Sequence, residues 1–239
     1  MSEIKRIAII GGSGNGLVIA QVVEDMAKAG HNIEVAGFLN DHEPIGSSIG
    51  GYKVIGRPKE WDALGPEVQI VFALLTVGKM EERSELLSVL AVPDARLATL
   101  VHPTAVVSSS VSVGKGTVIC SHVTCQPGCS IGSNSIVRAG ANLGHDAKVS
   151  DFVDIGPNCT LCGYSNVAKG VHVAPNSVVR DGVSVGEGLP SHVHGIYKGR
   201  KKVVDEAEIH ERIERGQTKA QVAREMGVSR MTVYRTLGK

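Results

Sequence analysis

The adjacent residues His145 and Asp146 are the pair in this sequence best suited to acid–base chemistry. An imidazole with an ordinary pKa near 6.5 can accept a proton from an attacking amine or hydroxyl group. A neighbouring carboxylate can orient the ring and stabilise the imidazolium that forms. Most His-Asp pairs are solvated surface residues, so the pair predicts a catalytic site only if its surroundings form a scaffold.

A second candidate site is a glycine-rich turn between an expected buried strand and an expected helix. It consists of Gly11, Gly12, Ser13, Gly14, Asn15 and Gly16. Backbone N–H groups at a helix start favour a phosphate group, and Asn40 and Asp41 after the next strand are candidates to contact a hydroxyl group or a base. Leu17 replaces the last glycine of the dinucleotide fingerprint. We therefore predict a nucleotide sugar as the ligand, with simple close packing of the glycines as the alternative.

The elements around this turn alternate between strand and helix. We expect strands at residues 5–10, 33–39, 52–55, 69–75 and 96–101, and helices at 17–29, 58–64 and 79–90. This alternation predicts a small α/β domain with a parallel sheet over residues 1–100.

Residues 101–185 contain a strict six-residue repeat. Fourteen of the fifteen positions from Val101 to Val185 in steps of six are aliphatic, the exception being Cys125. Four residues after each position the side chain is small. The period predicts a triangular parallel β-helix with 18 residues in each coil, because a helix or an alternating sandwich would need a period of 3.6 or 2. We expect left-handed backbone conformations at its corners, at Gly114, Gly132, Asn134, Gly144, Gly156 and Asn158.

The repeat also explains most of the five cysteines. Cys125, Cys129 and Cys159 fall on inward or small positions and are predicted to pack in the core, whereas Cys120 and Cys162 have no assigned role. Cys159 and Cys162 have redox or zinc spacing without a second pair at zinc-ribbon spacing, so we predict no metal site. An odd number of cysteines and the lack of a long apolar segment favour a cytoplasmic protein with no membrane partner.

The end of the sequence differs in charge from the rest. Residues 198–239 hold 11 Lys and Arg against 6 Asp and Glu, although the whole chain has a net charge of +1. Helices are expected at 205–215, 218–226 and 229–237, separated by Gly216 and Gly227. This pattern predicts a basic helix-turn-helix domain over residues 198–239. Its candidate DNA contacts are Arg200, Lys201, Arg230, Thr232 and Arg235.

Residues 4–193 resemble the acetyltransferases of bacterial sialic-acid and bacillosamine pathways. The matching segments are IAIIGGSGNG (7–16), GFLND (37–41), LVHPTAVV (100–107), NLGHDAKVSDFVDIGPNCTLCG (142–163) and GLPS (188–191). The resemblance implies a Rossmann-like nucleotide-sugar-binding domain followed by a left-handed β-helix at 101–197. It further implies a homotrimer with sites between subunits, acetyl-CoA as co-substrate and no permanently bound cofactor.

The same resemblance assigns roles to individual residues. It makes His145 the general base, supported by Asp146. Because no Ser or Cys is adjacent to His145 in the motif, we expect direct transfer without an acyl-enzyme intermediate. The resemblance places Gly163, Gly188 and Pro190 at acetyl-CoA, where the missing side chain of Gly163 leaves room for a thioester. Asp154 stands where the family often has a second histidine that contacts the acyl donor, so this contact differs here.

Three functions remain open from the sequence. The first is N-acetylation of a nucleotide-linked amino sugar for surface polysaccharide or glycan synthesis, and the second is sugar O-acetylation of the sialic-acid type. The third is a DNA-binding regulator that senses a metabolite, because residues 199–237 resemble the DNA-binding domain of serine recombinases, including its basic arm. A trimer fits poorly with the two-fold symmetry of paired DNA half-sites.

Overall fold

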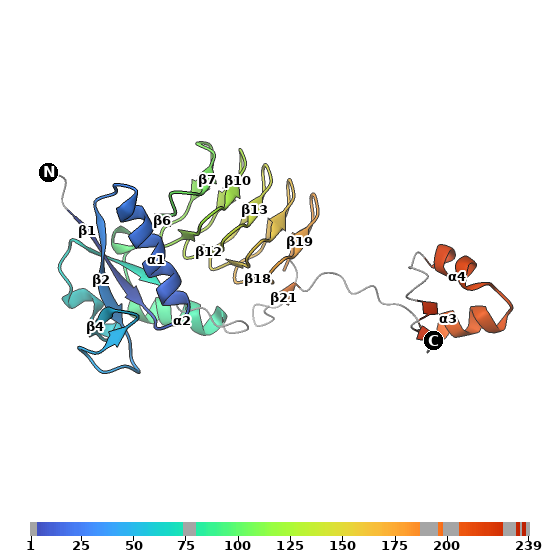
Figure 1. Ribbon diagram of the computed structural model, residues 1–239, viewed down its shortest axis with the longest axis horizontal. Coiled ribbons are helices and arrows are strands. Elements are labelled where there is room, and N and C mark those ends of the chain that lie inside the picture. Colours follow the sequence, from blue (N-terminus) through green and yellow to red (C-terminus); the bar gives the residue numbers. More distant parts are fainter. Residues whose placement is uncertain are drawn as a thin grey trace. The chain divides into compact units, whose positions relative to one another are not determined.

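The computed structural model describes residues 4–73, 80–186, 196–197, 206–226, 233–234 and 236–237. The chain divides into two compact units, residues 1–199 and 200–239, and each is considered by itself. The first unit contains an α/β part and a parallel β-helix, as Figure 1 shows.

The α/β part is a five-stranded sheet in the order β3-β4-β2-β1-β5. Its strands are β1 (Lys5–Ile10), β2 (Ile33–Leu39), β3 (Ser48–Ile49), β4 (Tyr52–Gly56) and β5 (Val68–Phe72), and its helices are α1 (Asn15–Lys28) and α2 (Met80–Leu90). All neighbouring strands are parallel except β3 and β4. Strand β1 lies between β2 and β5 and is buried from Ile7 to Ile10, which explains its apolar sequence.

Two of the expected elements differ from the observed ones. The predicted helix at 58–64 is a 3-10 helix, Pro58–Ala63. The predicted strand at 96–101 is shorter, because Asp94–Arg96 forms a 3-10 helix and only β6 (Leu100–Val101) is a strand. The other strands and helices expected in the α/β part are confirmed to within a few residues.

The β-helix consists of three parallel sheets, and the strands from β6 to β20 pair at a spacing of 18 residues, whereas β21 pairs with β18 at a spacing of 24. Sheet one contains β7 (Val106–Val107), β10 (Thr124–Cys125), β13 (Asn142–Leu143), β16 (Thr160–Leu161) and β19 (Val178–Val179). Sheet two contains β8 (Ser112–Val113), β11 (Ser130–Ile131), β14 (Lys148–Val149), β17 (Asn166–Val167) and β20 (Ser184–Val185). Sheet three contains β6, β9 (Val118–Ile119), β12 (Ile136–Val137), β15 (Asp154–Ile155), β18 (His172–Val173) and β21 (Ile196–Tyr197). The predicted fold class is confirmed.

The second residue of each strand from β9 to β20 points into a common core, as the repeat predicts. Left-handed backbone recurs every six residues from Gly116 to Gly182, each time three residues after an inward-pointing side chain. Asn134 and Asn158 are confirmed at such corners, but Gly114, Gly132, Gly144 and Gly156 are not left-handed. They are glycines because a Cβ would strike the next coil: on Gly144 it would come 2.7 Å from the Gly163 nitrogen.

The α/β part packs against the outward face of sheet three. Leu100, Val118 and Ile136 of that face share a buried cluster with Ile19 and Val22 of α1. A polar contact continues this interface, because His102 Nε2 lies 3.2 Å from Asp25 Oδ2 on α1. The glycine-rich turn that precedes α1 is thereby held at a fixed position on the β-helix.

The second unit contains α3 (Glu206–Glu214) and α4 (Lys219–Glu225) around a small core of Ile209, Val222, Ala223 and Val233. Thr218 caps α4, because its side chain accepts the Gln221 N–H. Across the whole described part of the chain, no helix is both long and apolar enough to cross a membrane.

Candidate functional site

His145 and Asp146 form a hydrogen-bonded pair at the corner between β13 and β14. His145 Nδ1 lies 3.0 Å from Asp146 Oδ2, and the two side chains are 52% and 47% exposed. Asp146 has a φ of 57°, and its N–H donates to the Pro127 carbonyl one coil earlier. Since the carboxylate accepts the Nδ1 proton of the neutral ring, Nε2 is the atom available to accept another proton.

Residues of the adjacent coils hold the imidazole in place. The backbone N–H of His145 donates to Gln126 Oε1 at 3.1 Å. The Tyr164 ring meets the imidazole edge to face, with centroids 4.9 Å apart. A Cβ on Gly163 would lie 2.8 Å from both Cε1 and Nε2 of His145, so the missing side chain of Gly163 makes room for the catalytic candidate's own ring.

The glycine-rich turn combines tight packing with an exposed tip. A Cβ on Gly11 would lie 2.9 Å from the Ala73 Cβ, and one on Gly16 would lie 2.6 Å from the Phe38 ring. These two glycines are therefore required by their neighbours. Ser13 and Gly14 are exposed, and α1 has no acidic residue in its first turn that would oppose an anion.

Asn40 braces this turn from the end of β2. Its Nδ2 donates to the Gly11 carbonyl at 2.8 Å, while its Oδ1 accepts from the His42 and Glu43 N–H groups. Asp41 beside it is exposed. Asn40 therefore holds the two loops together, and Asp41 is the residue of the pair that faces solvent.

A second polar cluster lies where α1 meets sheet three, and it is centred on Arg138. The Arg138 Nε lies 2.8 Å from Asp154 Oδ1, its Nη2 lies 3.3 Å from Asp154 Oδ2, and its Nη1 donates to Asn15 Oδ1 at 2.9 Å. His172 Nδ1 lies 2.8 Å from Asp154 Oδ2. Burial alone would raise the pKa of the Asp154 carboxyl, but the hydrogen bonds from His172 and Arg138 outweigh it and hold that pKa below its ordinary value.

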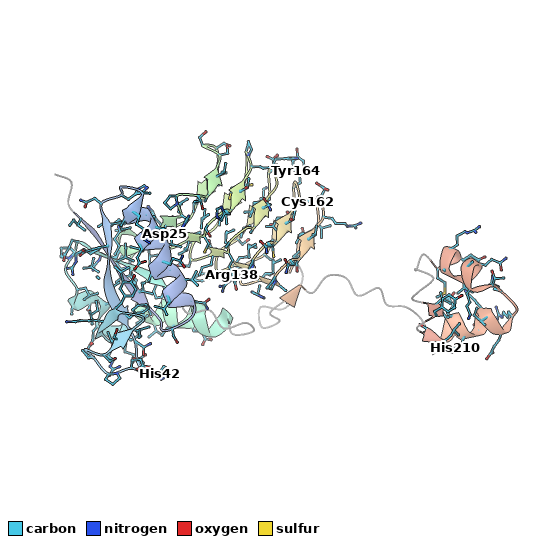
Figure 2. The ribbon with its side chains drawn as sticks, viewed as in Figure 1. Asp25, His42, Arg138, Cys162, Tyr164 and His210 are labelled. Carbon is cyan, nitrogen blue, oxygen red and sulfur yellow. The ribbon has the colours of Figure 1, made fainter. Side chains whose placement is uncertain are left out.

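Arg138 also lines a groove of about 470 Å³ between α1 and the β-helix. The α1 side is formed by Val18, Gln21, Val22 and Asp25, and the opposite side by turns that follow strands of sheet three. Figure 2 shows Arg138 beside α1, well apart from Tyr164 and Cys162, whose turns lie elsewhere on the β-helix.

The cysteines are free thiols that mostly fill the core. Cys125, Cys129 and Cys159 belong to the β-helix core, as predicted. Cys120 lies in the buried cluster between α1 and sheet three, where burial raises its pKa to about 11, and Cys162 is half-buried. Among the described residues, no group of three or more His, Cys, Asp or Glu side chains is arranged to hold a metal ion.

The predicted site residues thus fall into two groups within one chain. His145, Asp146 and Gly163 meet at a corner between sheets one and two, whereas Asn15 and Asp154 are joined through Arg138 at sheet three. The predicted contact of Asp154 with an acyl donor stays a prediction, and both of its oxygens already have partners. Seven further predicted residues lie outside the described residues: Gly188, Pro190, Arg200, Lys201, Arg230, Thr232 and Arg235.

The sequence interpretation missed four residues of these groups: Gln126, Arg138, Tyr164 and His172. A step of 18 residues from Asp154 reaches His172, so the repeat itself could have indicated that pair. Arg138 and Asn15 are 123 residues apart, and no spacing rule connects them.

Two family models match parts of the chain. Residues 6–90 match the PglD N-terminal domain, and residues 199–239 match the helix-turn-helix domain of resolvase. These two segments correspond to the predicted Rossmann-like and helix-turn-helix regions.

Curated relatives match over part of their length. The chain is 32% identical over 117 residues to a UDP-N-acetylbacillosamine N-acetyltransferase of Bacillus subtilis, covering 48% of this chain and 51% of the relative. It is 52% identical over 40 residues to the integrase-like protein y4lS of Sinorhizobium fredii, covering 17% of this chain and 22% of that protein. The chain therefore spans about half of the first relative and about a fifth of the second.

Among solved structures, the acetyltransferase domain of PglB from Neisseria gonorrhoeae has a TM-score of 0.59 and 22% identity, over 80% of this chain and 95% of that domain. The same domain in complex with acetyl coenzyme A gives a TM-score of 0.59 and 24% identity over 78% of this chain and 95% of that domain. This likeness shows a shared fold. Together with the family matches, it confirms the resemblance to sugar acetyltransferases in residues 4–193 and to a resolvase helix-turn-helix at the end of the chain.

Proposed function

We propose that this chain is an acyltransferase that moves the acetyl group of acetyl-CoA to the amino group of a nucleotide-linked amino sugar. The observation that carries the proposal is the His145–Asp146 pair, fixed over Gly163 on a β-helix of acetyltransferase fold. The substrate classes are those named for the relatives, an acetylbacillosamine enzyme and a domain solved with acetyl coenzyme A.

In the proposed reaction the amine nitrogen attacks the thioester carbonyl carbon directly. His145 Nε2 accepts a proton from the amine, the new C–N bond forms, the C–S bond breaks, and the CoA sulfur leaves and takes up a proton. Asp146 accepts the Nδ1 proton's hydrogen bond and stabilises the imidazolium. No acyl-enzyme is required, because His145 contacts neither a serine nor a cysteine among its described partners.

The nucleotide is proposed to bind at the glycine-rich turn, with Ser13 and Gly14 at the exposed tip and Asp41 at its edge. Since the His145 corner and the turn belong to different sides of the β-helix in one chain, the complete site is proposed to lie between subunits of a homotrimer. A second copy would then bring its own turn to the His145 corner.

The test is a panel of UDP-, GDP- and dTDP-linked 4-amino sugars assayed for CoA release with acetyl-CoA. Replacement of His145 by Ala should lower turnover by roughly two to four decades. His31, an exposed histidine before β2, provides the matched control, since His31→Ala should leave turnover unchanged. Equal turnover of H145A and the wild type would overturn the proposed base. If the 4-amino sugars are inactive and the corresponding 4-hydroxy sugars, assayed beside them, are acetylated, the reaction is O-acetylation instead.

A second function is proposed for residues 200–239, namely binding of double-stranded DNA. It is favoured by the resolvase helix-turn-helix match and by the excess of basic residues there. A gel shift with random duplex DNA at low and high salt should show binding that weakens as salt rises. A chain that ends at Gly199 is the control, and equal behaviour of the two chains would contradict DNA binding by this unit.

A further inference from the structure

Arg138 connects α1 of the α/β part with the β-helix, at the groove that lies between them. Its guanidinium is held by both oxygens of Asp154 on the β-helix and in turn holds Asn15, the first residue of α1. A guanidinium has five N–H donors, and three of them are used by these contacts. The remaining two belong to a side chain that is 21% exposed and lines the groove along α1.

The anchoring of Arg138 is stronger than a surface salt bridge. The Asp154 side chain is only 3% exposed, and His172 of the next coil donates its Nδ1 proton to the same carboxylate. An arginine fixed in this way has lost its rotamer freedom before any ligand arrives, so ligand binding does not have to order it. Its planar fork matches phosphate oxygens better than a flexible ammonium does.

The guanidinium of Arg138 lines one side of the groove along α1. The walls of the groove are the apolar Val18 and Val22, the amide of Gln21, and the turns that carry Cys120 and His122. Arg138 is hydrogen-bonded to Asn15, and the exposed tip of the glycine-rich turn immediately precedes Asn15. A molecule with phosphate groups at the tip can therefore reach Arg138 with those groups and the groove with the part attached to them.

We propose that Arg138 is a substrate-positioning residue that binds the phosphate groups of a nucleoside diphosphate compound at the glycine-rich turn, with Asp154 as the residue that positions Arg138. The groove along α1 then receives the group attached to the terminal phosphate. This inference rests on the proposed function for the identity of the whole substrate, but its central claim concerns phosphate binding alone.

The test measures binding and catalysis separately in the full chain. Calorimetric titration with UDP, GDP and dTDP identifies the diphosphate that the wild type binds, and the same titration is repeated with Arg138→Lys. Loss of the fork should weaken binding about ten- to hundredfold, the range for charge-assisted hydrogen bonds. In the acetylation assay the KM for the nucleotide sugar should rise, while the KM for acetyl-CoA stays unchanged.

Two further variants separate positioning from folding. Removing Arg138 alone leaves Asp154 buried without its cation, so the variant Arg138→Met with Asp154→Asn keeps the packing without a buried charge. Its thermal midpoint is measured alongside its affinity. The matched control is Arg6→Lys, which alters another carboxylate-paired arginine at the opposite end of β1 from the turn.

The outcomes distinguish this proposal from the proposed function. Weaker diphosphate binding in both Arg138 variants, with Arg6→Lys unchanged, supports the proposal even if no acetyl transfer is found. Acetyl transfer with unchanged diphosphate affinity in the Arg138 variants overturns it and leaves the acyltransferase function standing. A wild-type chain that binds none of the three diphosphates also overturns it.

Discussion

The imidazole of His145 lies directly over Gly163, one coil further along the β-helix, so closely that a Cβ on Gly163 would be 2.8 Å from its Nε2. The absence of a side chain at residue 163 therefore allows the imidazole of the proposed base to occupy its position. The Tyr164 ring, at the next residue, also meets the imidazole edge to face.

The first prediction follows from this contact. Gly163→Ala should push the imidazole away from its position and lower turnover on the order of a hundredfold, the cost expected for a displacement of about 1 Å. The measurement is kcat for CoA release. The double variant Gly163→Ala with His145→Ala is the control, because it should lose no more activity than His145→Ala alone. A full additional loss in the double variant would mean that residue 163 acts independently of the ring.

The second prediction concerns the support that Asp146 gives to His145. Asp146 is left-handed at φ 57°, and asparagine accepts this conformation whereas alanine is strained there. Asp146→Asn should therefore fold like the wild type but lower kcat about ten- to hundredfold, because a neutral amide stabilises the imidazolium less than a carboxylate does. Thermal unfolding should show Asp146→Asn near the wild type and Asp146→Ala below it. An unchanged kcat in the asparagine variant would remove Asp146 from the proposed mechanism.

Much of the β-helix follows from the sequence because each coil repeats the same two demands. An aliphatic side chain must point inward and a small one must fit near the corner, so the period of six is visible without any structure. The corners were predicted less well. Gly144 and Gly156 are glycines because the next coil is too close for a Cβ, and not because the backbone is left-handed. Composition alone does not distinguish these two reasons.

The candidate site also has one part that the sequence predicts and one part that it does not. The His145–Asp146 pair is local in sequence, so its hydrogen bond could be expected from the motif. Arg138 reaches Asn15 only because α1 packs on sheet three through Ile19, Val22 and Ile136, which is a consequence of tertiary packing. Contacts of that kind carry no signal in a single sequence.

The third prediction uses the difference in burial among the five thiols. Burial raises the pKa of Cys120 to about 11 and that of Cys125 to about 12, and it also raises the pKa of Cys129 and Cys159. At pH 8 these four thiols carry little thiolate and are shielded, so brief treatment with iodoacetamide should label Cys162 alone. Peptide mass spectrometry locates the label, and Cys162→Ser should take none. Rapid labelling of Cys120 would show that the groove beside it opens.

The fourth prediction concerns acid stability and Asp154. Because the folded state holds the pKa of this carboxyl below its ordinary value of 3.8, the folded state binds its proton less tightly than the unfolded state does. Its stabilising contribution is therefore fully present above the unfolded pKa and is lost as the pH falls through the folded pKa, below 3.8. Asp154→Asn should lower the free energy of unfolding by about 3 kcal/mol at pH 7, since it leaves the cation of Arg138 without its partner.

The difference between the wild type and Asp154→Asn should shrink as the pH falls below 3.8, because the unfolded wild type then takes up a proton that its folded state binds less tightly. Urea unfolding of both proteins at pH 7, 5 and 3 measures this difference in the free energy of unfolding. The comparison is Asp151→Asn, which changes an exposed aspartate three residues before β15 whose carboxylate accepts the Ser133 N–H. A constant difference between wild type and Asp154→Asn across this range would mean that Asp154 stabilises the fold by shape and hydrogen bonding, and not by its charge.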